Sequence, residues 1–432
     1  MSLIRNIKYS SISQIINMLL GVARVLLIPF LMDLASFGYW QVYVLYCGLA
    51  GLFSFGYTDG IYLKYGDKNI DELPLKQIRA SIVFYFLSLI ISVVILALCI
   101  FNLDLGSQKL VALMWVLPNI AIICVVGYFS IIFQVTNQIV SYSKYLIIDK
   151  LLFFIGLLLY VQFGEVEFIG LIYLDVASRA ILLFVLIINY YQYLFGDKSN
   201  YFNGLDLYKV LSKSGIKLLL ANFIGIIILT IARFFVEINF SLDEFAVFSF
   251  GMSLTSMFLM AVASISIVLY PSIKRLDIVG QKKQYTKINL YLFIITPCLL
   301  LIYFPAWYIV SNFIPLYGSV LDYLNLLFIF CVFQSKMQIQ LNLFYKVLRE
   351  ETRLFYANIE TLLVSIVFII IAHYIFESLY SVVLSFVMAI VIRTFRSELF
   401  FNKRFDLSNR LVYFHGAVCV IFYLVTVFFM CS

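Results

Sequence analysis

Arg24 lies inside the apolar run 17–34, where a permanent cation needs a physical reason. A charge at the centre of a membrane helix costs about 2.5–3.5 kcal/mol on insertion scales. No acidic residue lies within four positions of it, and Pro29 predicts a kink just beyond. Successive steps of 3, 1, 3, 4 and 3 residues predict one polar helical stripe, formed by Ser10, Ser13, Gln14, Asn17, Gly21 and Arg24. Two interpretations stay open: an interhelical salt bridge or snorkelling, or an anion-binding cation on a cavity wall.

Two further pairs of opposite charges have the spacing of neighbours on a helix. Arg233 is followed by Glu237, and Asp175 is followed by Arg179, each four positions later. Side chains at this spacing meet on one face of a helix. The first interpretation of both pairs is therefore a structural ion pair. The alternative for Arg233 is a second cation in a cavity wall, and for Asp175, Arg179 and Glu237 a role in ion coupling.

The segment 333–346 is unusually polar for a membrane helix. Gln334, Gln338 and Asn342 form one row at helical spacing, and Lys336 and Gln340 form a neighbouring row. Such a helix is typical of the wall of a wet cavity. Hydrogen bonding between packed helices is the alternative.

Counted together, the charges predicted to lie deep in the membrane show an excess of cations. The deep cations are Arg24, Arg179, Arg233 and Lys336, and the deep acids are Asp175, Glu237 and Glu360. A cationic excess favours an anionic substrate, whereas an exporter of organic cations should show the reverse. Glu360 is a candidate proton carrier. Asp59, Asp149 and Lys150 lie nearer helix ends, where solvation explains them, with a relay role as the alternative.

The composition of the 432 residues predicts a polytopic α-helical membrane protein. Of the residues, 64% are hydrophobic and 12% charged, against about 25% charged in soluble domains. A membrane β-barrel would show alternating ten-residue segments, which runs such as 82–101 lack. The seven cysteines form no CxxC pair and there are only two histidines, so we predict no metal and no cofactor. The net charge is +7, but we predict no soluble domain whose basic face could bind nucleic acid.

The apolar runs and the basic loops together predict the topology. Short loops separate the predicted spans, which are 11–32, 40–63, 80–101, 111–134, 144–163, 168–192, 214–238, 244–270, 288–311, 322–345, 354–375, 378–400 and a possible thirteenth at 411–430. Lysine and arginine gather in alternate loops, and Lys109 stands alone on the other side. This bias predicts a cytoplasmic N-terminus. The last run either crosses the membrane or lies at its surface.

A shift of 208 residues overlays the first six spans on the next six. The turn 34–40 then falls on 242–248, and the basic loop 64–79 falls on 272–287. Six spans per repeat predict parallel repeats, and in such transporters the substrate site lies between the halves near mid-membrane. We therefore predict an N-lobe at 1–200, a C-lobe at 201–402 and a tail at 403–432. The fold class is two pseudo-symmetric six-helix lobes around a central cavity, with a possible extra helix.

Three stretches resemble the Wzx-type polysaccharide flippases of the multidrug/oligosaccharidyl-lipid/polysaccharide exporter superfamily. They are "GVARVLLIPFLMDLASFGYWQVYVLY" at 21–46, "LFSFGYTDGIYLKYG" at 52–66 and "LYPSIKRLDIVGQKKQY" at 269–285, and the resemblance covers about residues 5–400. It implies a non-enzymatic flippase that moves an undecaprenyl-pyrophosphate-linked oligosaccharide across the bacterial inner membrane by alternating access. The product is an O-antigen of lipopolysaccharide, a capsule or another surface polysaccharide.

The resemblance also implies a cationic cavity for the pyrophosphate-sugar head, in which Arg24 is the best match. The candidate head-group residues are Arg24, Asn17, Gln14, Arg233, Lys336 and Gln340. The candidates for ion coupling or salt bridges are Asp59, Asp175, Arg179, Glu237 and Glu360. Expected partners are the lipid-linked oligosaccharide, membrane lipids and polymerase or chain-length proteins of the same pathway, with the chain itself a monomer.

Three other functions remain as alternatives, one of which is the peptidoglycan-lipid flippase branch of the superfamily, whose members typically have fourteen spans. A cation-coupled multidrug or small-molecule antiporter of the same superfamily predicts deep acids without a cationic excess. A membrane polysaccharide polymerase predicts a long extracytoplasmic loop to hold its acceptor, and the longest loop on that side is 101–110. The energy source, whether protons, sodium or membrane potential, stays open.

Overall fold

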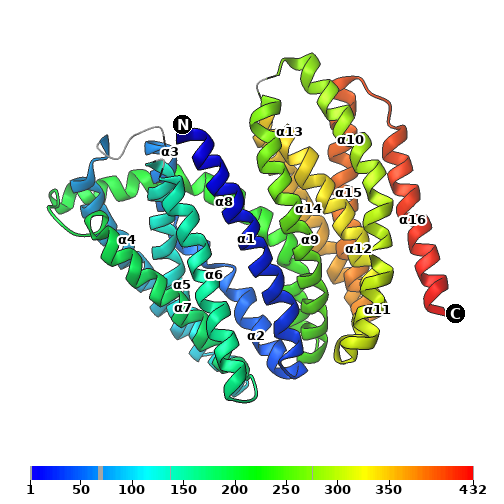
Figure 1. The fold of residues 1–432 in the computed structure, drawn as a ribbon, viewed down its shortest axis with the longest axis horizontal. Helices are drawn as coiled ribbons and strands as arrows, with labels where there is room; N and C mark the ends of the chain where they lie inside the picture. Colours follow the sequence, from blue (N-terminus) through cyan, green and yellow to red (C-terminus); the bar gives the residue numbers. More distant parts are fainter. Residues whose placement is uncertain (1, 67–71, 137, 275, 432) are drawn as a thin grey trace. The chain divides into compact units, whose positions relative to one another are not determined.

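A computed structural model describes residues 2–66, 72–136, 138–274 and 276–431, with the side chains of 2–12, 14, 139, 146, 261, 263–268, 270–272 and 431 left out. Throughout these ranges the regular structure is helical (Figure 1). The chain forms two compact units, Met1–Phe223 and Ile224–Ser432. Within the described ranges, 11 helical runs are long and apolar enough to cross a membrane, and Ile15–Phe30 is a shorter one. The protein is therefore a multi-pass membrane protein of the predicted all-α class.

The first unit begins with α1, which packs along α6. Its helices are α1 (Ser2–Phe30), α2 (Leu34–Cys47), η1 (Ala50–Ser54), α3 (Tyr57–Tyr65), α4 (Leu75–Phe101), α5 (Ser107–Val135), α6 (Ile139–Tyr160), η3 (Val161–Phe163), α7 (Phe168–Tyr190), η4 (Tyr191–Tyr193) and the first part of α8 (Tyr201–Asn239). The helix α5 contacts α2, α3, α4 and α7 and so forms the centre of the bundle.

The second predicted span, 40–63, is broken and not one continuous helix. The helix α2 ends at Cys47, a 3-10 turn follows, and α3 begins at Tyr57. Between them Phe55 and Gly56 have positive φ angles of 47° and 74°. The left-handed backbone region is open to glycine at little cost, and a Phe–Gly pair there ends a helix. Hydropathy averages over this break, which is why the sequence predicted one span.

The first part of α8 lies against the N-terminal unit. At 39 residues, α8 is about twice as long as the ~20 residues needed to cross a bilayer. Its buried positions in that part are Gly204, Leu207, Leu211, Gly215 and Leu219, whereas Lys209, Lys213 and Lys217 are exposed. This amphipathic pattern, with lysines on the polar face, is typical of a helix at the membrane surface. The basic loop predicted after the sixth span is thus a helix.

The second unit contains the extra helix. Its elements after α8 are α9 (Leu242–Lys274), α10 (Ile278–Leu301), α11 (Tyr303–Phe313), η5 (Pro315–Val320), α12 (Leu321–Lys336), the π-helical segment η6 (Met337–Leu341), α13 (Asn342–Val347), α14 (Glu351–Phe376), α15 (Leu379–Phe405) and α16 (Arg410–Cys431). The predicted polar span 322–345 is therefore helical but changes pitch at Met337, and single-turn π segments recur at functional sites.

The predicted thirteenth span forms α16, which packs against α10, α12 and α15 (Figure 1). His415, near its start, lies 2.9 Å from Lys336 at the end of α12. Thr426, near its end, accepts a hydrogen bond of 3.2 Å from Asn325 at the start of α12. The helix α16 therefore runs antiparallel along the length of α12. This packing favours a crossing helix over one lying on the membrane surface.

Glycines explain how closely α3 and α8 approach. A Cβ atom added at Gly215 would lie 1.9 Å from the carbonyl oxygen of Gly56, and one at Gly60 would lie 2.1 Å from that of Leu211. These contacts are with backbone atoms, which a rotamer change cannot relieve. The Gly-x-x-Asp-Gly motif at 56–60 thus permits the two backbones to touch.

We expect Gly215→Ala to destabilise the protein by about 3 kcal/mol or more, because overpacking against backbone exceeds the usual 1–3 kcal/mol. Gly225→Ala is the matched control on the same helix, where an added Cβ meets nothing within 4 Å. The control should gain stability, since alanine is the better helix former by about 1 kcal/mol. Thermal unfolding of the two purified variants in detergent checks this. Equal midpoints for both would contradict the packing described here.

Candidate functional site

Arg24 projects from α1 into a cluster of charges within the first unit. Its Nη2 donates to Oδ1 of Asp175 on α7 over 3.0 Å. Its guanidinium carbon also lies 4.0 Å from the ring centroid of Phe153 and 5.0 Å from that of Trp40. Of the two interpretations that the sequence left open, the interhelical salt bridge is therefore present, with an acid 151 positions away in the chain. The salt-bridge interpretation accounts for part of Arg24, whose side chain remains 25% exposed.

Asp175 is the centre of this cluster. Its side chain is only 2% exposed. Besides Arg24, its carboxylate accepts a hydrogen bond of 2.8 Å from the hydroxyl of Tyr43 and one of 3.4 Å from the amide of Asn119. The predicted pair with Arg179 is confirmed, with Nη1 3.2 Å from Oδ2. A buried carboxylate with four such partners is a compensated charge and not a free one.

Two residues of α6 extend the cluster toward α1. Asp149 lies 4.0 Å from Nε of Arg179. Lys150 donates to the backbone carbonyl of Asn17 over 3.3 Å. The amide oxygen of Asn17 is itself buried without a hydrogen-bond partner. The side chain of Gln14, the other predicted member of this stripe, lies outside the described residues.

The charges of the cluster do not cancel. Arg24, Arg179 and Lys150 supply three cations, and Asp149 and Asp175 supply two anions, which leaves one positive charge in excess. Arginine carries five N–H donors, and only one hydrogen bond from Arg24 ends on Asp175. The exposed remainder of this guanidinium can therefore bind an anion such as phosphate, to which arginine binds in a bidentate manner.

The predicted residues Asp59, Arg233 and Glu237 do not join this cluster. Asp59 is in the first turn of the short helix α3, where free backbone N–H groups favour a carboxylate. In the second unit Arg233 lies on α8 with its guanidinium 5.9 Å from the ring centroid of Phe245. Glu237 is buried one turn further along α8.

Lys336 and Gln340 are enclosed in the core of the second unit. Nζ of Lys336 lies 2.6 Å from a carboxylate oxygen of Glu398 and 2.9 Å from Nδ1 of His415. All three residues are at most 2% exposed. Gln340, in the π-helical segment, donates to the carbonyl of Tyr285 over 3.3 Å. The helix-packing interpretation of the polar segment 333–346 thus fits both residues in this conformation.

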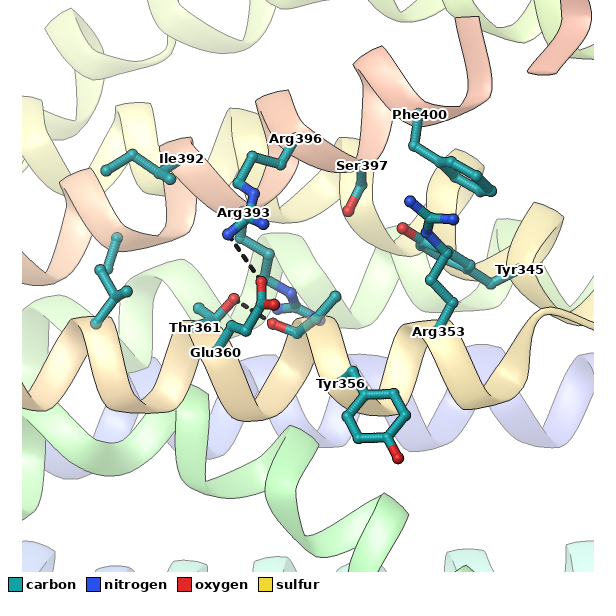
Figure 2. A pocket seen from close by; sticks show the side chains of 13 residues that line it. Tyr345, Arg353, Tyr356, Glu360, Thr361, Ile392, Arg393, Arg396, Ser397 and Phe400 are labelled. Carbon is teal, nitrogen blue, oxygen red and sulfur yellow. Dashed lines mark hydrogen bonds and ion pairs between the residues drawn. The ribbon is translucent and has the colours of Figure 1, made fainter. Parts of the chain in front are cut away.

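Glu360 forms an ion pair between α14 and α15. One of its carboxylate oxygens lies 2.8 Å from Nη1 of Arg396 (Figure 2). The pair borders a pocket to which Arg353 and Arg393 also contribute. Both members are exposed, by 53% for Glu360 and 64% for Arg396. Two charges exposed this far along apolar helices are costly against lipid.

The sequence did not predict which side chains contact the buried charges. Tyr43 and Asn119 read as ordinary residues of apolar spans, and nothing local marks them as ligands of a carboxylate. Glu398, Arg393 and Arg396 offered a better signal, since they form a charged stretch within the predicted span 378–400.

An apolar groove of about 430 Å³ lies within the second unit between α12, α15 and α16. Leu326, Val387, Phe395 and Val420 are among the residues that line it. Its lining is almost free of polar groups, so it suits a hydrocarbon chain and no charged ligand. In the part of the chain that the structure describes, no group of three or more His, Cys, Asp or Glu side chains is placed to hold a metal ion.

The fold of this chain is that of known membrane transporters. It is similar to the lipid II flippase MurJ in its inward closed conformation, with a TM-score of 0.69 and 14% identity over 96% of this chain and 97% of that one. A multidrug resistance transporter of the MATE family and MOP superfamily, in its inward-facing conformation, gives 0.60 and 15% over 90% and 98%. The MATE multidrug transporter DinF-BH, in a ligand complex, gives 0.58 and 12% over 94% and 95%. No family model matches the sequence, and no curated protein matches it.

The buried pair of Lys336 and Glu398 makes a prediction about stability. We expect Glu398→Gln to destabilise the protein by about 3–5 kcal/mol, because it leaves a buried cation without its counter-charge. Lys336→Met/Glu398→Gln should recover most of that loss, since no unpaired charge then remains. Thermal midpoints of the two purified variants and the native protein check this. A single variant as stable as the native protein would show that the pair does not support the fold.

Proposed function

We propose that the protein is a flippase for a lipid-linked oligosaccharide in the bacterial inner membrane. Its substrate is an undecaprenyl-pyrophosphate-linked repeat unit of a surface polysaccharide, either O-antigen or capsule. The substrate turns from the cytoplasmic to the outer leaflet by alternating access, and no covalent chemistry takes place. The sequence resemblance to polysaccharide flippases and the fold shared with MurJ support this proposal.

The observation that carries the proposal is the charge cluster around Arg24. Asp175 is sealed, with 2% of its side chain exposed, whereas 25% of Arg24 remains accessible. The acid thus fixes the arginine in place without using all its donors. A pyrophosphate would bind to a guanidinium that is already oriented for bidentate hydrogen bonds, in a cluster with one excess positive charge. The excess positive charge of the cluster would repel an organic cation.

The remaining predicted residues are further candidate contacts for the substrate within each unit. On α1, Gln14 and Asn17 would contact the sugar or phosphate beside Arg24. In the second half, Arg233 would supply a further cation. Lys336 and Gln340 are enclosed in this conformation, so they would contribute only after the π-helical segment repacks. Asp59, Glu237 and Glu360 are the groups through which ion binding would couple to transport, whereas Asp175 and Arg179 serve as a salt bridge beside Arg24.

The lipid tail needs a separate, apolar route. The groove between α12, α15 and α16 is apolar and has room for part of an isoprenoid chain. Its position against α16 gives the extra helix a role in holding the tail while the head crosses within the protein. Membrane lipids would occupy this groove when substrate is absent. Polymerase and chain-length proteins of the same pathway would receive the product.

A cation-coupled multidrug antiporter is the second candidate. The similarity to two MATE multidrug transporter structures supports it. Buried acids such as Asp175 are the groups that an organic cation or a coupling ion would need. In this chain that acid already has two arginine partners, which leaves little attraction for another cation.

A charge-neutral double variant separates a binding role of Arg24 from a structural one. Arg24→Gln should lower surface polysaccharide by about tenfold to a hundredfold, because a hydrogen bond to a charged group contributes about 1.5–3 kcal/mol. Arg24→Gln/Asp175→Asn should restore thermal stability but not transport. The measurement is surface polysaccharide in cells that lack the native gene, at matched protein levels.

Asp175→Asn alone is the control that keeps the cation. It should weaken binding of the anionic head less than Arg24→Gln does, because the guanidinium remains although the acid that orients it is lost. Native levels of polysaccharide from the double variant would mean that Arg24 only neutralises Asp175, and the proposed site would be lost.

A further inference from the structure

The seam between α14 and α15 encloses a pocket of about 140 Å³ with an arginine-rich lining (Figure 2). Arg353 comes from the first turn of α14, and Arg393 and Arg396 come from the middle of α15. Helical spacing explains the grouping, because Arg393, Arg396 and Phe400 follow steps of three and four on the face of α15 that meets α14. Three cations and the single acid Glu360 leave an excess of two positive charges.

Arg393 is the informative member of this group. Its side chain is buried, with 6% of the residue exposed. One nitrogen, Nη2, donates to the amide oxygen of Asn358 over 2.7 Å. Its Nε is buried without a hydrogen-bond partner. Within the described part of the chain, no carboxylate lies within 4.0 Å of this guanidinium. A buried cation held only by a neutral amide is poorly compensated and favours an added anion.

The other two arginines are already positioned around this pocket. The guanidinium carbon of Arg353 stacks 3.6 Å from the ring centroid of Phe400, which fixes its plane and leaves its edges for hydrogen bonds. Arg396 is held by Glu360 over 2.8 Å, an exchangeable partner because both side chains are exposed. Planar guanidinium edges from several directions match the oxygens of a phosphate group.

We propose that this pocket binds a phosphate-bearing anion between α14 and α15, with Arg393 at its buried end. The anion would pair with Nε of Arg393 and with the edge of Arg353, and it would compete with Glu360 for Arg396. The helix α15 ends at Phe405, so Arg393 lies about 18 Å of helix rise from that end. The ligand class is a phosphate or diphosphate ester, from either a lipid head group or a soluble metabolite. The inference does not rest on the proposed substrate.

Binding to the purified full-length chain tests this inference without any transport assay. The probes are inorganic pyrophosphate and, in a separate arm, phosphatidylglycerol in mixed micelles, at constant ionic strength. Each should raise the thermal midpoint if it binds the folded state. A response to pyrophosphate alone indicates a soluble ligand, and a response to phosphatidylglycerol alone indicates a lipid head. Either response supports the site, provided that it depends on the pocket residues.

Three variants examine that dependence. Arg393→Gln and Arg396→Gln should each raise the half-saturating concentration about tenfold or more. Ala357→Leu should do the same by filling the pocket while every charge is kept, so the inference stays testable if Arg393→Gln does not fold. Arg404→Gln is the matched control, because Arg404 lies on the same helix but pairs with Glu350 outside the pocket. It should change the value less than twofold.

No response to either probe would overturn the inference. An equal weakening in Arg404→Gln would also overturn it, because the effect would then be general surface charge. The readout is ligand binding by the purified protein and not transport. The pocket can therefore fail while the function proposed for Arg24 stands, and the reverse also holds.

Discussion

A charge inside a membrane protein persists only when other groups compensate it, and Asp175 is where this constraint is met most completely. Two arginines, a tyrosine hydroxyl and an asparagine amide converge on its carboxylate from α1, α2, α5 and α7. The same contacts that offset the burial of the acid hold four helices together. They also fix Arg24 in an orientation that leaves part of its guanidinium accessible. Stability and the binding proposed for Arg24 thus depend on one ionic network.

The second unit meets the same constraint in two different ways. Lys336 and Glu398 neutralise each other in an enclosed core to which α16 adds His415, so this pair serves the packing of the extra helix. The arginines between α14 and α15 are not neutralised, since Glu360 is the single acid of their pocket. Charge balance and exposure therefore distinguish the structural pair Lys336–Glu398 from the anion site proposed between α14 and α15. Neither property follows from residue type alone.

Hydropathy and charge bias predicted the fold class, the order of the helices and the extra span at 411–430, because these signals are properties of single segments. The broken second span was missed, since one pair of left-handed residues, Phe55 and Gly56, is invisible to averaged hydropathy. The pairing of Arg24 with Asp175 was missed because it joins positions 151 apart. The i,i+4 pair of Asp175 and Arg179 was found because helix geometry alone dictates it. The sequence predicted an excess of cations among all the deep charges of the chain, whereas the charges near Arg24 include Lys150 and Asp149, which the sequence assigned to helix ends.

In the proposed mechanism, the exposed part of Arg24 binds the diphosphate of a lipid-linked oligosaccharide. The most direct measurement is the rate at which purified protein in proteoliposomes moves undecaprenyl-pyrophosphate-linked oligosaccharide between leaflets, with the cationic dye ethidium as a parallel cargo. The account predicts rapid movement of the lipid, no movement of the dye, and loss of lipid movement when Arg24 is replaced by glutamine. Movement of the dye without the lipid, or lipid movement that is unchanged without Arg24, would contradict it.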